Sequence, residues 1–194
     1  MFNKRRRKHY SLPTTHYSLN PRGFTLIELL TVILIIAILS IAGMVVYTNV
    51  DKRTKDSLRV GDLTNINQVI MTVLSEAGTI DANLLCGTGN PFPCRGSTYP
   101  IGTNTRKIDS TGWIKINFVG QNNVSFSANS LPVDPTNDST YHYTYCASGN
   151  QWEVNATLAV NDQNKMQNDG GDDPNKYEIG TNMSLINVVS GCNY

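Results

Sequence analysis

The sequence lacks the short motifs that mark common enzyme classes. It contains no Gly-x-Ser-x-Gly elbow, no His-Glu-x-x-His pair and no glycine-rich phosphate loop. Only three of the 194 residues are histidine, and two of them, His9 and His16, lie near the beginning of the chain. His142 stands among tyrosines in a strand-like stretch. The sequence therefore predicts no catalytic residue and no enzymatic activity.

Acidic residues are absent before Gly23, and charged residues make up only 16% of the chain. Six basic residues precede Gly23: Lys4, Arg5, Arg6, Arg7, Lys8 and Arg22. The remainder has ten basic and fifteen acidic residues. A basic cluster can bind nucleic acid or direct nuclear import, but one that precedes a first apolar helix also holds that end in the cytoplasm. We favour the second interpretation, which places the acidic remainder outside the cytoplasm.

Proline is absent between Phe24 and Ala77, and Leu29–Val46 is apolar apart from two hydroxyl residues. These residues, about 18 in number, nearly cross a bilayer core of roughly 30 Å as a helix. Helical spacing continues in the apolar residues Leu63, Ile66, Ile70, Val73 and Ala77. The sequence predicts one helix over 24–77, with a membrane-spanning part at 24–46 and a stop at Gly78.

Glu28 is out of place at the edge of this apolar run. An acidic side chain costs about 2.5 to 3.5 kcal/mol at the centre of a membrane helix, and somewhat less near an end. The nearby cations are Arg22 and, if the chain were cut between Gly23 and Phe24, the new amino group of Phe24. The carboxylate therefore needs a partner.

The stretch Gly23-Phe24-Thr25-Leu26-Ile27-Glu28 with its apolar run resembles the class III signal of type IV pilins and type II secretion pseudopilins. The resemblance implies that residues 1–23 are a leader, and that a prepilin peptidase cuts after Gly23 and methylates Phe24. It also implies that Glu28 pairs with the Phe24 amino group of a neighbouring subunit during assembly.

An ordinary secretory signal is the alternative. Ser40-Ile41-Ala42 fits a small-x-small cleavage site, with the basic residues 4–8 and the apolar residues 29–39 before it. The product would then be a free secreted domain. We favour the class III signal, because the alternative leaves Gly23-Phe24 without a role.

Cysteines are few but even in number, and all four follow the apolar run. An oxidising compartment would allow them to form disulfides. Four cysteines permit three pairings, of which we favour Cys86 with Cys94 and Cys146 with Cys192. A zinc site is the alternative, but no Cys-x-x-Cys pair is present.

The part after the helix predicts a small sheet. Residues 78–112 are rich in glycine, proline and asparagine, and we expect an irregular connection there. Strand-like alternation follows at 113–118, 140–146 and 151–160, with a hairpin turn at 147–150. Tyr141, Tyr143 and Tyr145 share one face, which we expect to pack on the helix; stacking on sugars or bases is the alternative. The predicted fold is α+β: a long N-terminal helix and, over 113–194, an antiparallel sheet head braced by disulfides.

An acidic loop near the end of the chain offers the hard oxygens that calcium prefers. Residues 161–173 do not match the spacing of an EF-hand. The order of elements around this loop nevertheless resembles the head of the major pseudopilin, whose corresponding loop binds calcium. That order is Leu131-Pro132-Val133-Asp134-Pro135, then a hairpin, then the acidic loop. The candidate calcium ligands are Asp162, Asp169, Asp172 and Asp173. A solvated loop without metal is the alternative, and we expect no other cofactor.

These features lead to two hypotheses. The first is a structural subunit, pilin or pseudopilin, that is held in the inner membrane and then polymerises through its N-terminal helix. The resemblance implies as partners copies of itself, the prepilin peptidase, and an assembly platform with its motor ATPase; we expect no direct contact with nucleic acid. The second hypothesis is a membrane-tethered or secreted binding module that does not polymerise.

Overall fold

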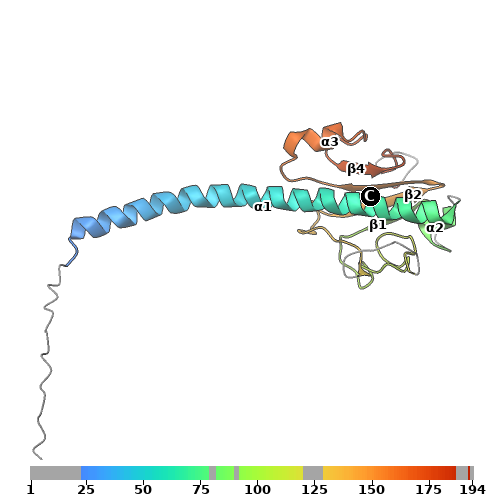
Figure 1. Ribbon diagram of the computed structural model, residues 1–194, viewed down its shortest axis with the longest axis horizontal. Helices are drawn as coiled ribbons and strands as arrows, with labels where there is room; N and C mark the ends of the chain where they lie inside the picture. The colour runs from blue at the N-terminus through green and yellow to red at the C-terminus, as the bar shows by residue number, and fades with distance from the viewer. Residues whose placement is uncertain (1–22, 79–81, 90–91, 120–128, 187–191, 193–194) are drawn as a thin grey trace, which may run out of the picture. The chain divides into compact units, whose positions relative to one another are not determined.

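The structure is a computed structural model that describes residues 23–78, 82–89, 92–119, 129–186 and 192. It divides into two compact units, Met1–Gly43 and Met44–Tyr194, and each is described by itself. A long helix, a small antiparallel sheet and two disulfides confirm the predicted α+β class. The elements are, in chain order, α1 (Leu26–Ala77), α2 (Ala82–Cys86), β1 (Cys94–Ser97), β2 (Tyr143–Ser148), β3 (Gln151–Ala156), η2 (Asp162–Asn164), α3 (Lys165–Asn168) and β4 (Tyr177–Gly180) (Figure 1).

Helix α1 is 52 residues long. No proline interrupts it, and Gly78 follows its last residue in a left-handed conformation, with φ of 69°. This confirms the predicted stop. The helix begins at Leu26, two residues later than expected, because Thr25 caps its first turn.

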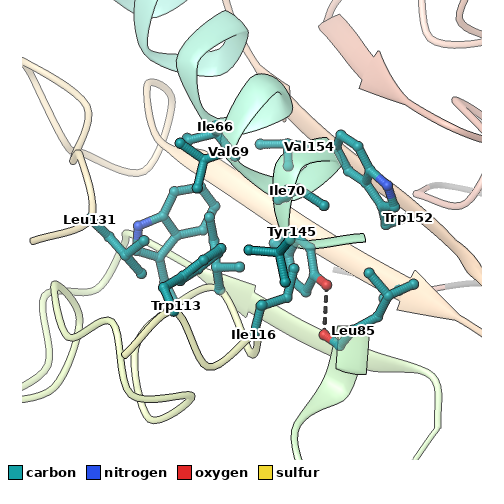
Figure 2. Close-up of a cluster of buried hydrophobic side chains, with 14 of the residues drawn as sticks. Ile66, Val69, Ile70, Leu85, Trp113, Ile116, Leu131, Tyr145, Trp152 and Val154 are labelled. Carbon is teal, nitrogen blue, oxygen red and sulfur yellow. Dashed lines mark hydrogen bonds between the residues drawn. The ribbon is translucent and has the colours of Figure 1, made fainter. Parts of the chain in front are cut away.

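Within the second unit, α1 buries one face. The buried side chains recur every three or four residues, as the sequence predicted, and belong to Leu63, Ile66, Val69, Ile70, Val73 and Leu74. Each fully buried leucine or isoleucine contributes about 1.5 to 3 kcal/mol relative to an exposed one. Figure 2 shows Ile66, Val69 and Ile70 meeting side chains from the strands and loops. The expectation was wrong for Ala77, which is exposed at the end of the helix.

The sheet is antiparallel throughout, in the order β1-β2-β3-β4. Strands β2 and β3 form a hairpin in which Ser148 pairs with Gln151, so the turn consists of Gly149 and Asn150 alone. Gly149 has φ of 61°, the left-handed conformation that tight hairpin turns require and that glycine adopts without strain.

Both faces of β2 and β3 are buried. One face joins the core with α1, through Tyr143, Tyr145, Ala147, Trp152, Val154 and Ala156. The opposite face carries polar residues, Thr144, Glu153 and Asn155, and these are buried as well. They tolerate burial because they are hydrogen-bonded: Glu153 Oε2 accepts the N–H groups of Leu185 (2.8 Å) and Ile186 (2.9 Å).

Two strands of the sheet come from stretches that the sequence analysis did not assign to strands. Strand β1, like helix α2, lies in the stretch 78–112 that we expected to be irregular, and β4 follows the acidic loop. Conversely, the strand predicted at 113–118 is wrong. Trp113 N–H donates to Thr105 O (3.1 Å) and Phe118 N–H to Ile108 O (2.8 Å), so this segment bonds to 105–108 instead of entering the sheet.

Two disulfides brace the second unit. Cys86 is bonded to Cys94, and Cys146 to Cys192, which is the pairing that we favoured among the three. The first joins the end of α2 to the start of β1. The second holds Cys192 against β2, where Cys146, Leu185, Ile186 and Cys192 form a small buried cluster.

Candidate processing and assembly site

The proposed cleavage point lies directly before α1. Gly23, Phe24 and Thr25 are not helical, and the Phe24 side chain is 87% exposed. Apart from the chain neighbours of Gly23, no atom of the described residues lies within 4 Å of the position that a Cβ would take there. The peptide bond between Gly23 and Phe24 is therefore outside the helix and open on the side of the glycine, as cleavage by a peptidase requires.

Thr25 and Glu28 cap the helix reciprocally. Glu28 Oε2 accepts both the Thr25 N–H (2.8 Å) and the Thr25 hydroxyl (2.8 Å), while the Glu28 N–H donates to Thr25 Oγ1 (3.2 Å). This is the capping box, which satisfies N–H groups that the first turn leaves without an intrahelical acceptor. Glu28 is thus bonded within its own chain, and its carboxylate lies beside the backbone that follows Phe24.

The capping role of Thr25 was missed in the sequence analysis. The signal was present, because a threonine followed three residues later by glutamate, just before an apolar run, predicts a capping box. The charge of Glu28 by itself predicts a cation as the partner of its carboxylate. In the structure, this carboxylate instead accepts a hydrogen bond from the backbone N–H of Thr25.

The part of α1 that lies in the first unit exposes its apolar side chains. Its large apolar side chains are exposed by between 53%, at Leu30, and 82%, at Leu26. Among the described residues, α1 is the one helix that is long and apolar enough to cross a membrane. Apolar surface this continuous is typical of a segment that lipid or other protein covers.

The four candidate calcium ligands do not come together. Asp162 pairs with Arg53 (2.9 Å), and Asp172 is exposed. Asp169 accepts the N–H groups of Gly171 and Glu178 through its two carboxylate oxygens. Asp173 Oδ1 accepts the N–H of Asn175 (2.9 Å).

Across the described part of the chain, no group of three or more acidic, histidine or cysteine side chains is arranged to hold a metal. As they stand, the four carboxylates do not form the cage of six to eight oxygens that calcium takes. Calcium binding therefore stays a prediction from the sequence.

The tyrosines of β2 are part of the core. Tyr143 and Tyr145 are fully buried, and their hydroxyls donate to Asp62 Oδ2 (2.8 Å) and Leu85 O (2.7 Å; Figure 2 shows the second bond). Burial raises the pKa of Tyr143, and the Asp62 carboxylate raises it further. Packing on the helix is therefore confirmed for these two residues, and stacking on sugars or bases is excluded for them.

His142, the one histidine among the described residues, is half-buried beside Tyr99. Its Nδ1 lies 3.1 Å from Asp138 O. Burial lowers the pKa of His142, and the nearby Lys176 lowers it further. These contacts hold the ring in place and do not pair it with a nucleophile.

Residues 19–44 match the family model of the prokaryotic N-terminal methylation motif. The chain carries a type IV pilin-like class III signal. The matched residues include Gly23, Phe24 and the Thr25–Glu28 capping box. The class III signal supports a precursor of the pilin or pseudopilin type, with a structural rather than a catalytic role, membrane anchoring and processing by a prepilin peptidase. Comparison with curated proteins and with solved structures gives no significant match.

Proposed function

We propose that this chain is a structural subunit, pilin or pseudopilin, of a type IV pilus-like filament. The observation that carries the proposal is the class III signal, with a non-helical, exposed cleavage point directly before a capped apolar helix. Before assembly, this helix anchors the subunit in the inner membrane. In the filament, the same apolar surface packs against other copies, so that burial supplies the cohesion.

The N-terminus stays in the cytoplasm until cleavage, because six basic and no acidic residues lie before the cut. The head crosses to the periplasmic or extracellular side, where its two disulfides are stable. The partners are copies of the chain, the prepilin peptidase, and an assembly platform with its motor ATPase. The acidic balance of the exported part disfavours direct binding of nucleic acid.

Glu28 has two successive partners in this proposal. In the isolated chain it caps the first turn through Thr25. After cleavage the charged amino group of Phe24 lies one residue before Thr25, close to the same carboxylate. During assembly, Glu28 turns to the amino group of a neighbouring subunit and sets the axial register.

The test is N-terminal sequencing with intact mass, on protein from membranes and from sheared surface material. We expect a start at Phe24, with a mass about 14 Da higher if the amino group is methylated. A start at Gly43 would mean ordinary signal-peptide cleavage and would overturn the proposal. Correct processing without any sheared fraction would favour a membrane-tethered binding module.

A matched variant separates recognition by the peptidase from folding. Because a Cβ at Gly23 meets no described atom beyond the chain neighbours, we expect Gly23→Val to leave α1 and the head folded. We expect this variant to accumulate in membranes as the uncleaved precursor. Processing at the normal rate would contradict recognition at this glycine.

A further inference from the structure

Charge is divided unevenly over the exported part of the chain. The segment 95–119 has four basic residues, Arg95, Arg106, Lys107 and Lys115, and one acidic residue, Asp109. The rest of the chain after Gly23 has six basic and fourteen acidic residues. A basic segment on an otherwise acidic head favours an anionic partner at that location.

The basic segment contains a small polar pocket. Its volume is about 250 Å³, and its wall includes Ser97, Thr103, Asn104, Thr111, Gly112 and Lys115. Ligand pockets for whole small molecules usually measure about 300 to 1,000 Å³ and are largely apolar. This pocket is smaller and polar, so it suits one charged group rather than an entire apolar ligand.

Lys115 brings a charge to this wall without a counter-charge. Its Nζ donates to Gly112 O (2.7 Å), and no carboxylate in the described part of the chain forms an ion pair with it. Burial lowers the pKa of Lys115, and no acid in the described part of the chain offsets this effect. An ammonium group has three N–H bonds, so donors remain beyond the bond to Gly112.

Other donors on the wall are also available. Ser97 Oγ accepts the Tyr99 N–H (3.2 Å), which leaves its own hydrogen to donate. The side chains of Thr103 and Asn104 are exposed and make no hydrogen bond to another described residue. The Thr111 hydroxyl, in contrast, is already donated to Asp109 Oδ1 (2.5 Å).

We propose that this pocket binds a phosphate group, held by the Lys115 ammonium with the hydroxyl and amide donors of Ser97, Thr103 and Asn104. A phosphate group supplies both the missing negative charge and several strong acceptor oxygens. The group is inorganic phosphate or the phosphate of a sugar phosphate. Each of these residues belongs to the second unit, so a single chain contains the whole pocket. The proposal therefore does not depend on filament formation.

The test uses the full mature chain in a nonionic detergent, at constant ionic strength, with inorganic phosphate and a sugar phosphate as separate probes in calorimetric titration. We expect saturable binding of at least one probe. Lys115→Met should weaken binding by about tenfold or more, because it removes a charge-assisted contact. Equal affinities would assign binding to the phosphate group alone, and tighter binding of the sugar phosphate would add contacts to the sugar.

Two control variants make the test decisive. Lys52→Met removes the same charge from an exposed position on α1, outside the basic segment and the pocket wall, and it should change the affinity by less than about twofold. Asn104→Ala alters an exposed side chain and leaves the fold intact, but it should weaken binding severalfold. The proposal fails if neither probe binds, or if Lys52→Met weakens binding as much as Lys115→Met does.

Discussion

Arg59 and Asp134 form a buried, bidentate ion pair between α1 and a distant loop. Arg59 Nε donates to Asp134 Oδ2 (2.7 Å) and Nη2 to Oδ1 (3.0 Å), and the two residues are 1% and 4% exposed. Arg59 Nη1 also donates to Asp56 Oδ1 (2.8 Å), whose carboxylate in turn accepts the N–H groups of Ala159 and Val160. The Arg59 guanidinium thus ties α1 to the Asp134 loop, and the Asp56 carboxylate, also on α1, ties the helix to Ala159 and Val160.

Replacing Arg59 should destabilise the head strongly. We expect Arg59→Met to lower the free energy of unfolding by about 3 to 5 kcal/mol, because it leaves the buried carboxylates of Asp134 and Asp56 without their cation. Denaturant unfolding, followed by the fluorescence of the buried Trp113 and Trp152, measures this loss.

The matched control is Arg53→Met. Arg53 pairs with Asp162 at the surface, where both side chains are about half exposed, so we expect a loss of about 0 to 1 kcal/mol. Equal losses of unfolding free energy in the two variants would show that the buried Arg59 pair contributes no more to stability than the exposed Arg53 pair.

Glu28→Ala should leave cleavage after Gly23 largely intact but impair filament formation. The substitution removes both the capping carboxylate and the charge that the proposed assembly step uses. Thr25→Ala separates the two effects, because it removes the cap, at about 1 kcal/mol, and keeps the charge.

We expect Thr25→Ala to assemble in the assay, quantification of sheared filaments, in which Glu28→Ala fails. Normal filaments from Glu28→Ala would contradict the assembly role. Equal failure of both variants would indicate that Glu28 acts through the cap.

The two disulfides should differ in their contributions. Cys146 and Cys192 are 46 positions apart, and Cys86 and Cys94 only 8. The chain-entropy model gives roughly 4 kcal/mol for the longer loop and roughly 2.6 kcal/mol for the shorter one. Paired replacement of each set by alanine, followed by denaturant unfolding, checks the order. A larger loss from the short loop would show that native packing, rather than loop length, decides the contribution.

Stability should fall as the pH rises, because of Glu178. This side chain is 2% exposed beside the Glu153 carboxyl, and its Oε1 has no hydrogen-bond donor within the described residues. Burial, supported by Glu153 and Asp172, raises the pKa of Glu178 from 4.5 to about 8. The folded state therefore holds a proton that the unfolded state releases, so this stabilisation is complete below about pH 4.5 and is lost as the pH rises through about 8.

Unfolding midpoints measured between about pH 5 and pH 9 test this dependence. We expect Glu178→Gln, which stays neutral and can still donate to Glu153, to flatten the curve. Glu76→Gln removes an exposed acid from α1 and should keep the slope of the unchanged protein. An unaltered slope in Glu178→Gln would contradict the assignment.

Local features of this protein could be predicted from the sequence alone. The class III signal, the apolar run, the helical face from Leu63 to Val73 and the stop at Gly78 all depend on residues close to one another in the chain. The hairpin of β2 and β3 is equally local, since a two-residue turn joins its strands. The capping box of Thr25 and Glu28 could have been predicted for the same reason.

The tertiary structure decided what depends on residues far apart in the chain. Trp113–Phe118 alternates like a strand, yet its backbone bonds to 105–108, while β1 and β4 complete the sheet. Asp134 belongs to a motif that is visible in the sequence, but its partner Arg59 lies 75 positions away. The charge of Lys115 was equally visible, whereas its half-buried place in a polar pocket was not. Buried polar and charged groups need hydrogen-bond partners and counter-charges, and these come from residues that are far apart in the chain. A local sequence pattern therefore does not predict such pairs.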